Sequence, residues 1–173
     1  MSKVTDRVSL RLNKIVLARL QKEADGSGIS LNAIVSKALK HHTDWHSNAV
    51  KAGFITVRRA TILKLLDKVS DDEIRKIGHD VASSESKDFV LLLRNEYSID
   101  SALEVIETWI KISGYPYKHE TQFEKHKYFI QHDMGRKWSL YLSEVYSFIF
   151  EDFGHKRPEF VIRDNTLSFD ITT

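Results

Sequence analysis

The feature that most constrains the fold of this chain is an unbroken alternation of polar and apolar side chains near its N-terminus, Arg7-Val8-Ser9-Leu10-Arg11-Leu12. A period of two is typical of a half-buried β-strand, here with Arg7, Ser9 and Arg11 on the polar face. No second strand-like pattern occurs in the first 50 residues, and a lone strand leaves its backbone polar groups unpaired. The sequence therefore predicts that the strand pairs with a second copy of the chain, as an antiparallel ribbon in a twofold dimer.

Two helices are predicted directly after this strand. Asn13 can cap a helix that runs from Lys14 to about Asp25, with apolar residues at helical spacing. The small residues Gly26-Ser27-Gly28 end that helix. Ser30 can cap a second amphipathic helix, which extends to about residue 46. The expected order is thus strand, helix, tight turn and helix.

The charges of the chain are distributed unevenly. Residues 1–60 carry 11 Lys+Arg and four Asp+Glu, a net charge of +7, whereas residues 61–173 carry 15 and 20, a net charge of −5. Basic charge concentrated in one third of a chain is typical of a surface that binds phosphates. The sequence therefore favours nucleic acid as a partner of the N-terminal segment.

The same segment resembles a known family, the ribbon-helix-helix DNA-binding domains of the Arc/MetJ/CopG type. The elements that carry the resemblance are the strand, the helix from Lys14, the small turn after it, and the second helix, which opens with Ile29-Ser30-Leu31-Asn32-Ala33-Ile34. The resemblance implies a homodimer, or a tetramer, whose two-stranded ribbon enters the major groove of double-stranded DNA.

The resemblance also implies roles for individual residues. The expected base-contacting residues are Arg7, Ser9 and Arg11, and the expected phosphate-contacting residues are Ser30, Leu31, Asn32 and Lys3. General physical chemistry supports both roles, because arginine can donate two hydrogen bonds to guanine and the N-terminus of a helix attracts anions.

The longer acidic segment shows a mixture of helical and strand patterns. We expect helices from about Val57, from Ser70, from Ser98 and over 138–153, and strands over Phe89-Val90-Leu91-Leu92-Leu93, over 123–133, and in a hairpin of 160–163 with 167–171. The predicted fold class is α+β, an intertwined ribbon-helix-helix dimer followed by a small α/β sandwich with a mainly antiparallel sheet. The predicted domains are residues 1–50, a helical connector at 51–86, and a sensor or dimerisation domain at 87–173.

Two further features of the acidic segment suggest binding sites. Arg136 and Lys137 lie in the first turn of a predicted helix, where cations oppose the helix dipole, so we predict a candidate anion or effector site at Arg136, Lys137 and Ser139. Aromatic residues of the loop 115–119 and the helix face Tyr141, Val145, Phe148, Ile149 either line a pocket or belong to the core.

Other classes of function lack a signature in this sequence. The chain has no cysteine, and we predict no metal site, no cofactor and no enzymatic activity. His126 and His132 lie too far apart on one predicted strand to share an ion, so a similarity in plan to the nickel-responsive regulators extends to architecture at most. No apolar run is long enough to span a bilayer and the N-terminus lacks the apolar core of a signal peptide, so we expect a cytoplasmic protein that does not bind a membrane.

The sequence as a whole favours a DNA-binding transcription regulator, such as a repressor, that acts as a homodimer. Its C-terminal domain would supply further dimer contacts or sense a small effector. An alternative is an antitoxin-like protein, which binds a protein partner through its acidic part and represses its own promoter. The size and aromatic content of the second domain disfavour that alternative, because toxin-binding tails are short and disordered when free.

Overall fold

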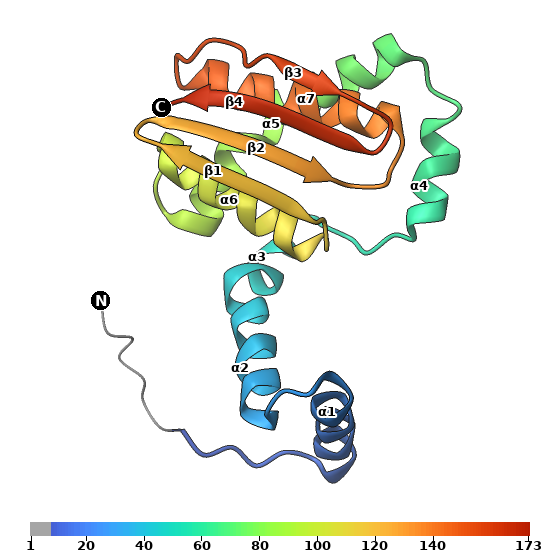
Figure 1. Ribbon diagram of the computed structural model, residues 1–173, viewed down its shortest axis with the longest axis vertical. Helices are drawn as coiled ribbons and strands as arrows, with labels where there is room; N and C mark the ends of the chain where they lie inside the picture. The colour runs from blue at the N-terminus through green and yellow to red at the C-terminus, as the bar shows by residue number, and fades with distance from the viewer. Residues whose placement is uncertain (1–7) are drawn as a thin grey trace. The chain divides into compact units, whose positions relative to one another are not determined.

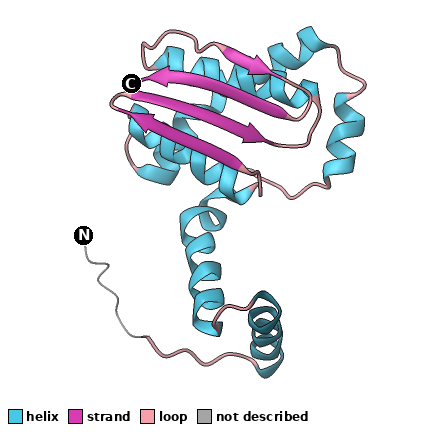
Figure 2. Ribbon diagram, viewed as in Figure 1, coloured by secondary structure: helices cyan, strands magenta, loops and turns pink. Residues whose placement is uncertain are grey.

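The computed structural model of this chain describes residues 8–173. The chain divides into two compact units, Met1–Thr43 and Asp44–Thr173, which we call the N-terminal unit and the C-terminal unit. Figure 1 follows the chain along its length, and Figure 2 shows that helices predominate and that the strands of the described residues all lie in the C-terminal unit. The boundary between the units lies before the first predicted domain boundary, at residue 50.

The N-terminal unit consists of an irregular segment and two helices. Residues 8–13 have no regular secondary structure, and α1 (Lys14–Ser27) and α2 (Leu31–His41) follow. Asn13 caps α1 by accepting a hydrogen bond from the N–H of Ile15 at 2.8 Å, and Gly28 ends the helix in the left-handed conformation with a φ of 65°. Ser30 caps α2 through the N–H of Ala33 at 3.1 Å. The predicted caps are confirmed.

The predicted fold class is wrong for this part of the chain. The described residues of the expected ribbon strand, from Val8 to Leu12, form no strand, and the first regular element is the helix α1. The physical reason is that a strand is held by hydrogen bonds to a neighbouring strand, and no other strand exists among the described residues of this unit. Alternation along a sequence determines which face a strand would bury, but it supplies no such neighbour.

The C-terminal unit contains the remaining elements. A π-helical turn, η1 (His42–His46), leads into it, and its regular elements are α3 (Ser47–Ala49), α4 (Arg59–Leu66), α5 (Asp71–Arg94), α6 (Ile99–Ile112), β1 (Tyr117–Gln122), β2 (Lys125–Gln131), α7 (Arg136–Asp152), β3 (Phe160–Ile162) and β4 (Thr166–Thr172). The predicted caps at Ser70 and Ser98 are again confirmed, the first as a reciprocal capping box with Glu73. The predicted connector, residues 51–86, belongs to this unit, since α5 runs through its end.

The four strands form one antiparallel sheet in the order β1-β2-β4-β3. The hairpin of β3 and β4 confirms its prediction, and its partners include Phe160 and Phe169. Figure 1 shows α6 and α7 against one face of the sheet. The buried residues between them form the core: Val105, Ile106, Ile110, Tyr128, Ile130, Leu142, Phe150, Leu167, Phe169 and Ile171. Side chains of the opposite face, such as Lys127 and Phe129, are exposed, so the sheet is covered by helices on one side.

One predicted strand of this unit is also wrong, and another is shorter than expected. The apolar run Phe89–Leu93 is the last part of α5, because no proline interrupts the helix that Ser70 starts, and this helix continues through Gly78 until Asn95 ends it in the left-handed conformation. The strand expected over 123–133 is confirmed as β2, but it is shorter than expected, since a turn at Phe123, with a φ of 54°, precedes it and it ends at Gln131. Its hairpin partner β1 was not predicted. In addition, no helix within residues 8–173 has the length and apolar character needed to cross a membrane.

Candidate functional site

The N-terminal unit holds the predicted DNA-contacting residues. Lys3 and Arg7 lie outside the described residues. Ser9 and Arg11 lie in the irregular segment before α1, and both are exposed. Ser30, Leu31 and Asn32 lie at the start of α2, where the first turn of a helix leaves backbone N–H groups without an intrahelical acceptor. The structure thus places the predicted base and phosphate contacts of the described part on two separate segments of one small unit.

Apolar side chains of the N-terminal unit are largely exposed. Within residues 8–43, the buried apolar side chains are those of Ala24 and Ile34. The exposed ones include Val8 at 75%, Leu10 at 56%, Ile15 at 65% and Leu39 at 53% of their surface. Two helices that bury so little cannot supply the apolar burial that stabilises a folded domain. The described part of this unit therefore has an apolar surface that its own residues leave uncovered.

The predicted anion site at the start of α7 is filled by contacts within the chain. Arg136 forms an ion pair with Asp71 at the start of α5. Lys137 donates hydrogen bonds to the backbone carbonyls of Leu66 and Asp67, at 3.0 and 3.2 Å. Both cations therefore have partners, which removes the electrostatic reason for predicting an anionic ligand. Their contacts hold the starts of α5 and α7 and the end of α4 together.

Ser139, the third residue of that prediction, belongs to a buried polar network. His132 accepts the N–H of Met134 at Nδ1, at 3.0 Å, so its proton lies on Nε2, which donates to the Ser139 hydroxyl at 2.7 Å. Ser139 in turn donates to the carbonyl of Arg163 at 2.7 Å. Burial, with a smaller contribution from the positive charge of Arg59, lowers the pKa of His132 to about 4. This neutral histidine fastens the turn between β2 and α7 to the β3–β4 hairpin.

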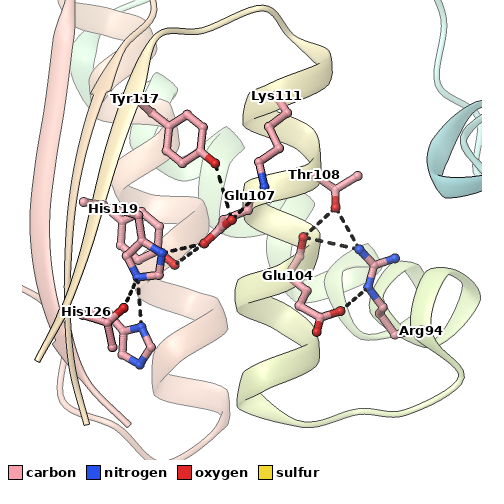
Figure 3. Close-up of polar contacts among 10 residues, drawn as sticks. Arg94, Glu104, Glu107, Thr108, Lys111, Tyr117, His119 and His126 are labelled. Carbon is pink, nitrogen blue, oxygen red and sulfur yellow. Dashed lines mark hydrogen bonds and ion pairs between the residues drawn. The ribbon is translucent and has the colours of Figure 1, made fainter. Parts of the chain in front are cut away.

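A second polar cluster lies between α6 and the hairpin of β1 and β2, and Figure 3 shows its members. The carboxylate of Glu107 is 2.6 Å from Nδ1 of His119, and Nε2 of His119 is 3.0 Å from Nδ1 of His126. Lys111 donates to the other oxygen of Glu107 at 2.9 Å. These contacts form a continuous chain from carboxylate to imidazole to imidazole, in which Glu107 orients the first ring.

The charges of this cluster depend on one another. Burial raises the pKa of Glu107, but the hydrogen bonds and charges of Lys111 and His119 outweigh it, so the pKa lies below its usual value. Burial lowers the pKa of His126, and the neighbouring His119 lowers it further. Among the described residues, no group of three or more histidine and carboxylate side chains is placed to hold a metal ion. The cluster therefore serves as a fixed electrostatic link between helix and sheet.

Sequence reasoning missed the pairing of His119 with His126. We treated 115–119 as a loop, and a loop gives no reason to place His119 beside a residue seven positions later. The observed register sets Thr121 opposite His126 and His119 opposite Tyr128, which brings the two histidines diagonally together on one face of the hairpin. The signal that was available was the turn at Phe123-Glu124 between two alternating polar segments.

Comparison with known proteins gives no relative for this geometry: no protein-family model, no curated protein and no solved structure matches the chain.

Proposed function

We propose that this chain is a sequence-specific, DNA-binding transcription regulator that works as a homodimer in the cytoplasm. The observation that carries the proposal is the composition of the N-terminal unit, which combines positive charge with uncovered apolar surface. Residues 8–43 contain six Lys+Arg and two Asp+Glu, a net charge of +4 in a segment whose helices bury little. DNA presents a dense row of phosphates, and clustered Lys and Arg on a small unit favour binding to it.

The second part of the proposal, the homodimer, follows from the apolar side chains. A second copy supplies the same uncovered apolar surface in a twofold arrangement, so each copy covers the other and the positive faces of both act on one duplex. Dimerisation of this kind also explains how helices of 14 and 11 residues can be stable in water. The predicted ribbon geometry forms no part of this proposal.

The residue roles within the proposal differ in kind. Arg11, with Ser9, is proposed to contact bases, whereas Ser30, Leu31 and Asn32 at the start of α2 are proposed to bind a phosphate. Base contacts discriminate between sequences, while phosphate contacts strengthen binding to all sequences alike. These roles can therefore be separated by experiment.

The first test measures binding of the full chain to a fluorescent duplex of random sequence while the salt concentration rises from about 50 to 200 mM. The expected result is a steep, log-linear loss of affinity. The double variant Arg11→Ala/Lys14→Ala is expected to bind at least about tenfold more weakly and to show a shallower salt dependence, because it removes two positive charges from the N-terminal unit and fewer counterions are then released on binding. The matched control is the double variant Lys127→Ala/Lys156→Ala. It removes two exposed lysines of the C-terminal unit and is expected to leave the affinity for DNA unchanged.

The second test separates the residue roles. Selection of preferred duplexes from a random library is repeated with Arg11→Ala and with Asn32→Ala. We expect Arg11→Ala to lose about 1–3 kcal/mol of discrimination at one base pair, and Asn32→Ala to keep the preferred sequence with a lower affinity. Absence of binding at the lowest salt, or an equal loss in the control pair, contradicts the proposal.

A further inference from the structure

One segment of the C-terminal unit leaves its apolar side chains on the surface. Residues 51–66 follow α3 and include α4, and none of their side chains is buried. The exposed fraction is 82% for Ile55, 41% for Val57 and 60% for Leu65. Large apolar side chains that gather on a surface are typical of a site that another molecule covers. We call residues 51–66 the basic segment, because of the charges described next.

The basic segment carries positive charges and no negative charge. Its cations are Lys51, Arg58, Arg59 and Lys64, and it contains no Asp or Glu. Arg58 and Lys64 are exposed and form no ion pair or hydrogen bond with any residue that the structure describes. Other cations of this unit are paired within the chain, as Arg75 is with Glu144 and Arg94 is with Glu104. The charges of the basic segment are therefore available to a partner that has apolar and acidic groups.

A pocket of about 580 Å³ lies between α5, α6 and α7, next to the basic segment. Its walls are mostly apolar and include Trp109 from α6 and Val145 from α7. Phe54 of the basic segment also lines the pocket, and it stacks on Phe89 of α5 with 4.9 Å between the ring centroids. The exposed Ile55 therefore comes directly after a residue that forms part of the pocket wall.

The charged groups of the pocket lining are exposed. The hydroxyl of Tyr146 and the indole N–H of Trp138 are buried and make no hydrogen bond with any described residue, so neither reaches the pocket surface. Glu85 and Asp88 of α5 are exposed lining residues, and neither forms an ion pair with a described residue. With Lys51, the third charged residue of the lining, they give a net charge of −1. The pocket thus combines apolar walls with two carboxylates at its opening.

The basic segment and the pocket are complementary in both respects. The segment has exposed aliphatic side chains and unpaired cations, and the pocket has apolar walls and unpaired carboxylates. A twofold axis presents the same surface of each copy to the other, so a segment can enter the pocket of the second copy while its own pocket receives the second copy's segment. A small molecule in the pocket would leave Ile55 exposed, whereas a second copy covers the pocket and the segment together.

We propose that the C-terminal units of two copies of this chain pair around a twofold axis, with Ile55 and Val57 of each copy against the pocket of the other. Arg58 and Lys64 then lie near Glu85 and Asp88 of the partner subunit. All these residues belong to the C-terminal unit, so this interface does not depend on the proposed DNA binding or on the proposed contacts of the N-terminal unit.

The test uses disulfide formation between introduced cysteines, because the chain itself has no cysteine. Full chains that carry Ile55→Cys are mixed with full chains that carry Ser84→Cys, a change at an exposed position of the pocket lining. Under mild oxidation we expect a disulfide between positions 55 and 84, identified by the mass of the linked peptides. Each chain has a single cysteine, so this disulfide joins two copies.

The matched control replaces Ser84→Cys by Thr172→Cys. Thr172 is exposed and pairs with Lys125 in the sheet, on the face that the helices leave uncovered. We expect the cysteines at positions 55 and 172 to be linked at least about tenfold more slowly than those at positions 55 and 84, because random collisions alone bring them together.

Charge reversal in both cysteine-bearing chains tests the pairing itself. Arg58→Glu/Lys64→Glu and, separately, Glu85→Lys/Asp88→Lys are each expected to slow the disulfide between positions 55 and 84 at least about tenfold, because like charges then face each other. Chains with all four reversals should regain the original rate, since opposite charges face each other again. All four positions are exposed, and circular dichroism confirms that the variants are folded.

Three results would overturn the proposal. The first is a disulfide between positions 55 and 84 that forms no faster than the control, which would leave the pocket to a different occupant. The second is a rate that neither pair of reversals changes, and the third is a rate that stays low with all four reversals. None of these measurements contains DNA, so failure of this interface and failure of the proposed function are observed separately.

Discussion

The two units of this chain show two ways in which a sequence can be stabilised. In the C-terminal unit, side chains such as Phe150 and Leu167 have no exposed surface, and a helical layer covers one face of a sheet. In the N-terminal unit, amphipathic helices of ordinary length leave Ile15 and Leu39 more than half exposed. The described part of the N-terminal unit therefore has well-defined local structure without a core, whereas the C-terminal unit has both local structure and a core.

This difference shows that helix formation and core formation are separate requirements. Caps such as Asn13 and Ser30 work through hydrogen bonds within a few residues, so they form in either unit. A core needs apolar side chains from elements distant in sequence, and residues 8–43 contain only two short neighbouring helices. The comparison predicts opposite responses to the same kind of substitution in the two units.

The largest expected difference concerns apolar truncation. Phe169 is 2% exposed and contacts Tyr128, Tyr146 and Phe150, so Phe169→Ala should lower the free energy of unfolding by about 3–5 kcal/mol. Leu10→Ala, at a side chain that is 56% exposed, should change it by less than about 0.5 kcal/mol in dilute protein. Urea unfolding followed by circular dichroism measures both.

The dependence on protein concentration sharpens this first prediction. A cost of Leu10→Ala that grows with protein concentration indicates that a second copy covers this side chain. A cost of several kcal/mol in dilute protein would contradict the comparison, because it would require a core within the N-terminal unit itself.

The second prediction concerns the loss of stability of the C-terminal unit at acidic pH. The pKa of His132 is about 4 in the folded chain against 6.5 for an ordinary histidine, so the unfolded chain binds the extra proton first as the pH falls. The contribution of His132 to the free energy of unfolding is therefore fully present above pH 6.5. It decreases by about 3 kcal/mol in total as the pH falls to about 4. The pH dependence of the unfolding free energy, compared with that of His132→Asn, should reveal the difference.

The low pKa of Glu107 acts in the same direction but at lower pH. A carboxyl whose pKa is depressed contributes stability above its ordinary value of 4.5, and this contribution is lost as the pH falls below that value. If His132→Asn loses stability between pH 6.5 and 4 as steeply as the wild type, this histidine does not cause the pH dependence of the unfolding free energy.

The smallest expected effects come from one substitution made in both units. A Cβ at Gly78 in α5 would lie 2.8 Å from the carbonyl oxygen of Tyr141 and 3.1 Å from Cβ of Glu144 in α7. Gly78→Ala should therefore lower the unfolding free energy by about 1–3 kcal/mol, although alanine is the better helix former. Gly26→Ala in α1 meets no atom within 4 Å and should stabilise its helix by about 0.5–1 kcal/mol.

Thermal unfolding of both variants beside the wild type measures these changes. Opposite signs support the comparison, since the same added methyl group is crowded in one unit and free in the other. A stabilising effect of Gly78→Ala would instead mean that α5 and α7 pack less closely than the structure shows.

The candidate sites were predictable from the sequence to different degrees. The sequence predicts that the helix face with Tyr141, Val145 and Ile149 either lines a pocket or belongs to the core. These three residues do line a pocket between α5, α6 and α7. Phe148 does not, since its ring packs edge-on against His79 at 5.4 Å. The unpaired hydroxyl of Tyr146 could not be predicted, because the lack of a partner depends on every atom that surrounds it.

The cations at the start of α7 show the opposite case. A sequence places Arg136 and Lys137 at a helix N-terminus without showing what lies nearby. Only folding brings Asp71, 65 positions earlier, and the carbonyl of Leu66 to these two side chains. The unfavourable position of these two cations at the positive end of the α7 dipole is thus compensated by acceptors from α4 and α5.

By itself, the sequence determined the features that act over a few residues: the caps at Asn13, Ser30, Ser70 and Ser98, the hairpin of β3 and β4, and the opposite charges of the two segments. Tertiary structure decided whether apolar and alternating runs became helix, strand or neither. Residues 89–93 belong to α5, which packs along α7, and residues 8–12 form no strand because no neighbouring strand is present among the described residues of their unit. The physical reason is that capping hydrogen bonds are local, whereas strand pairing and burial require partners that are distant in sequence.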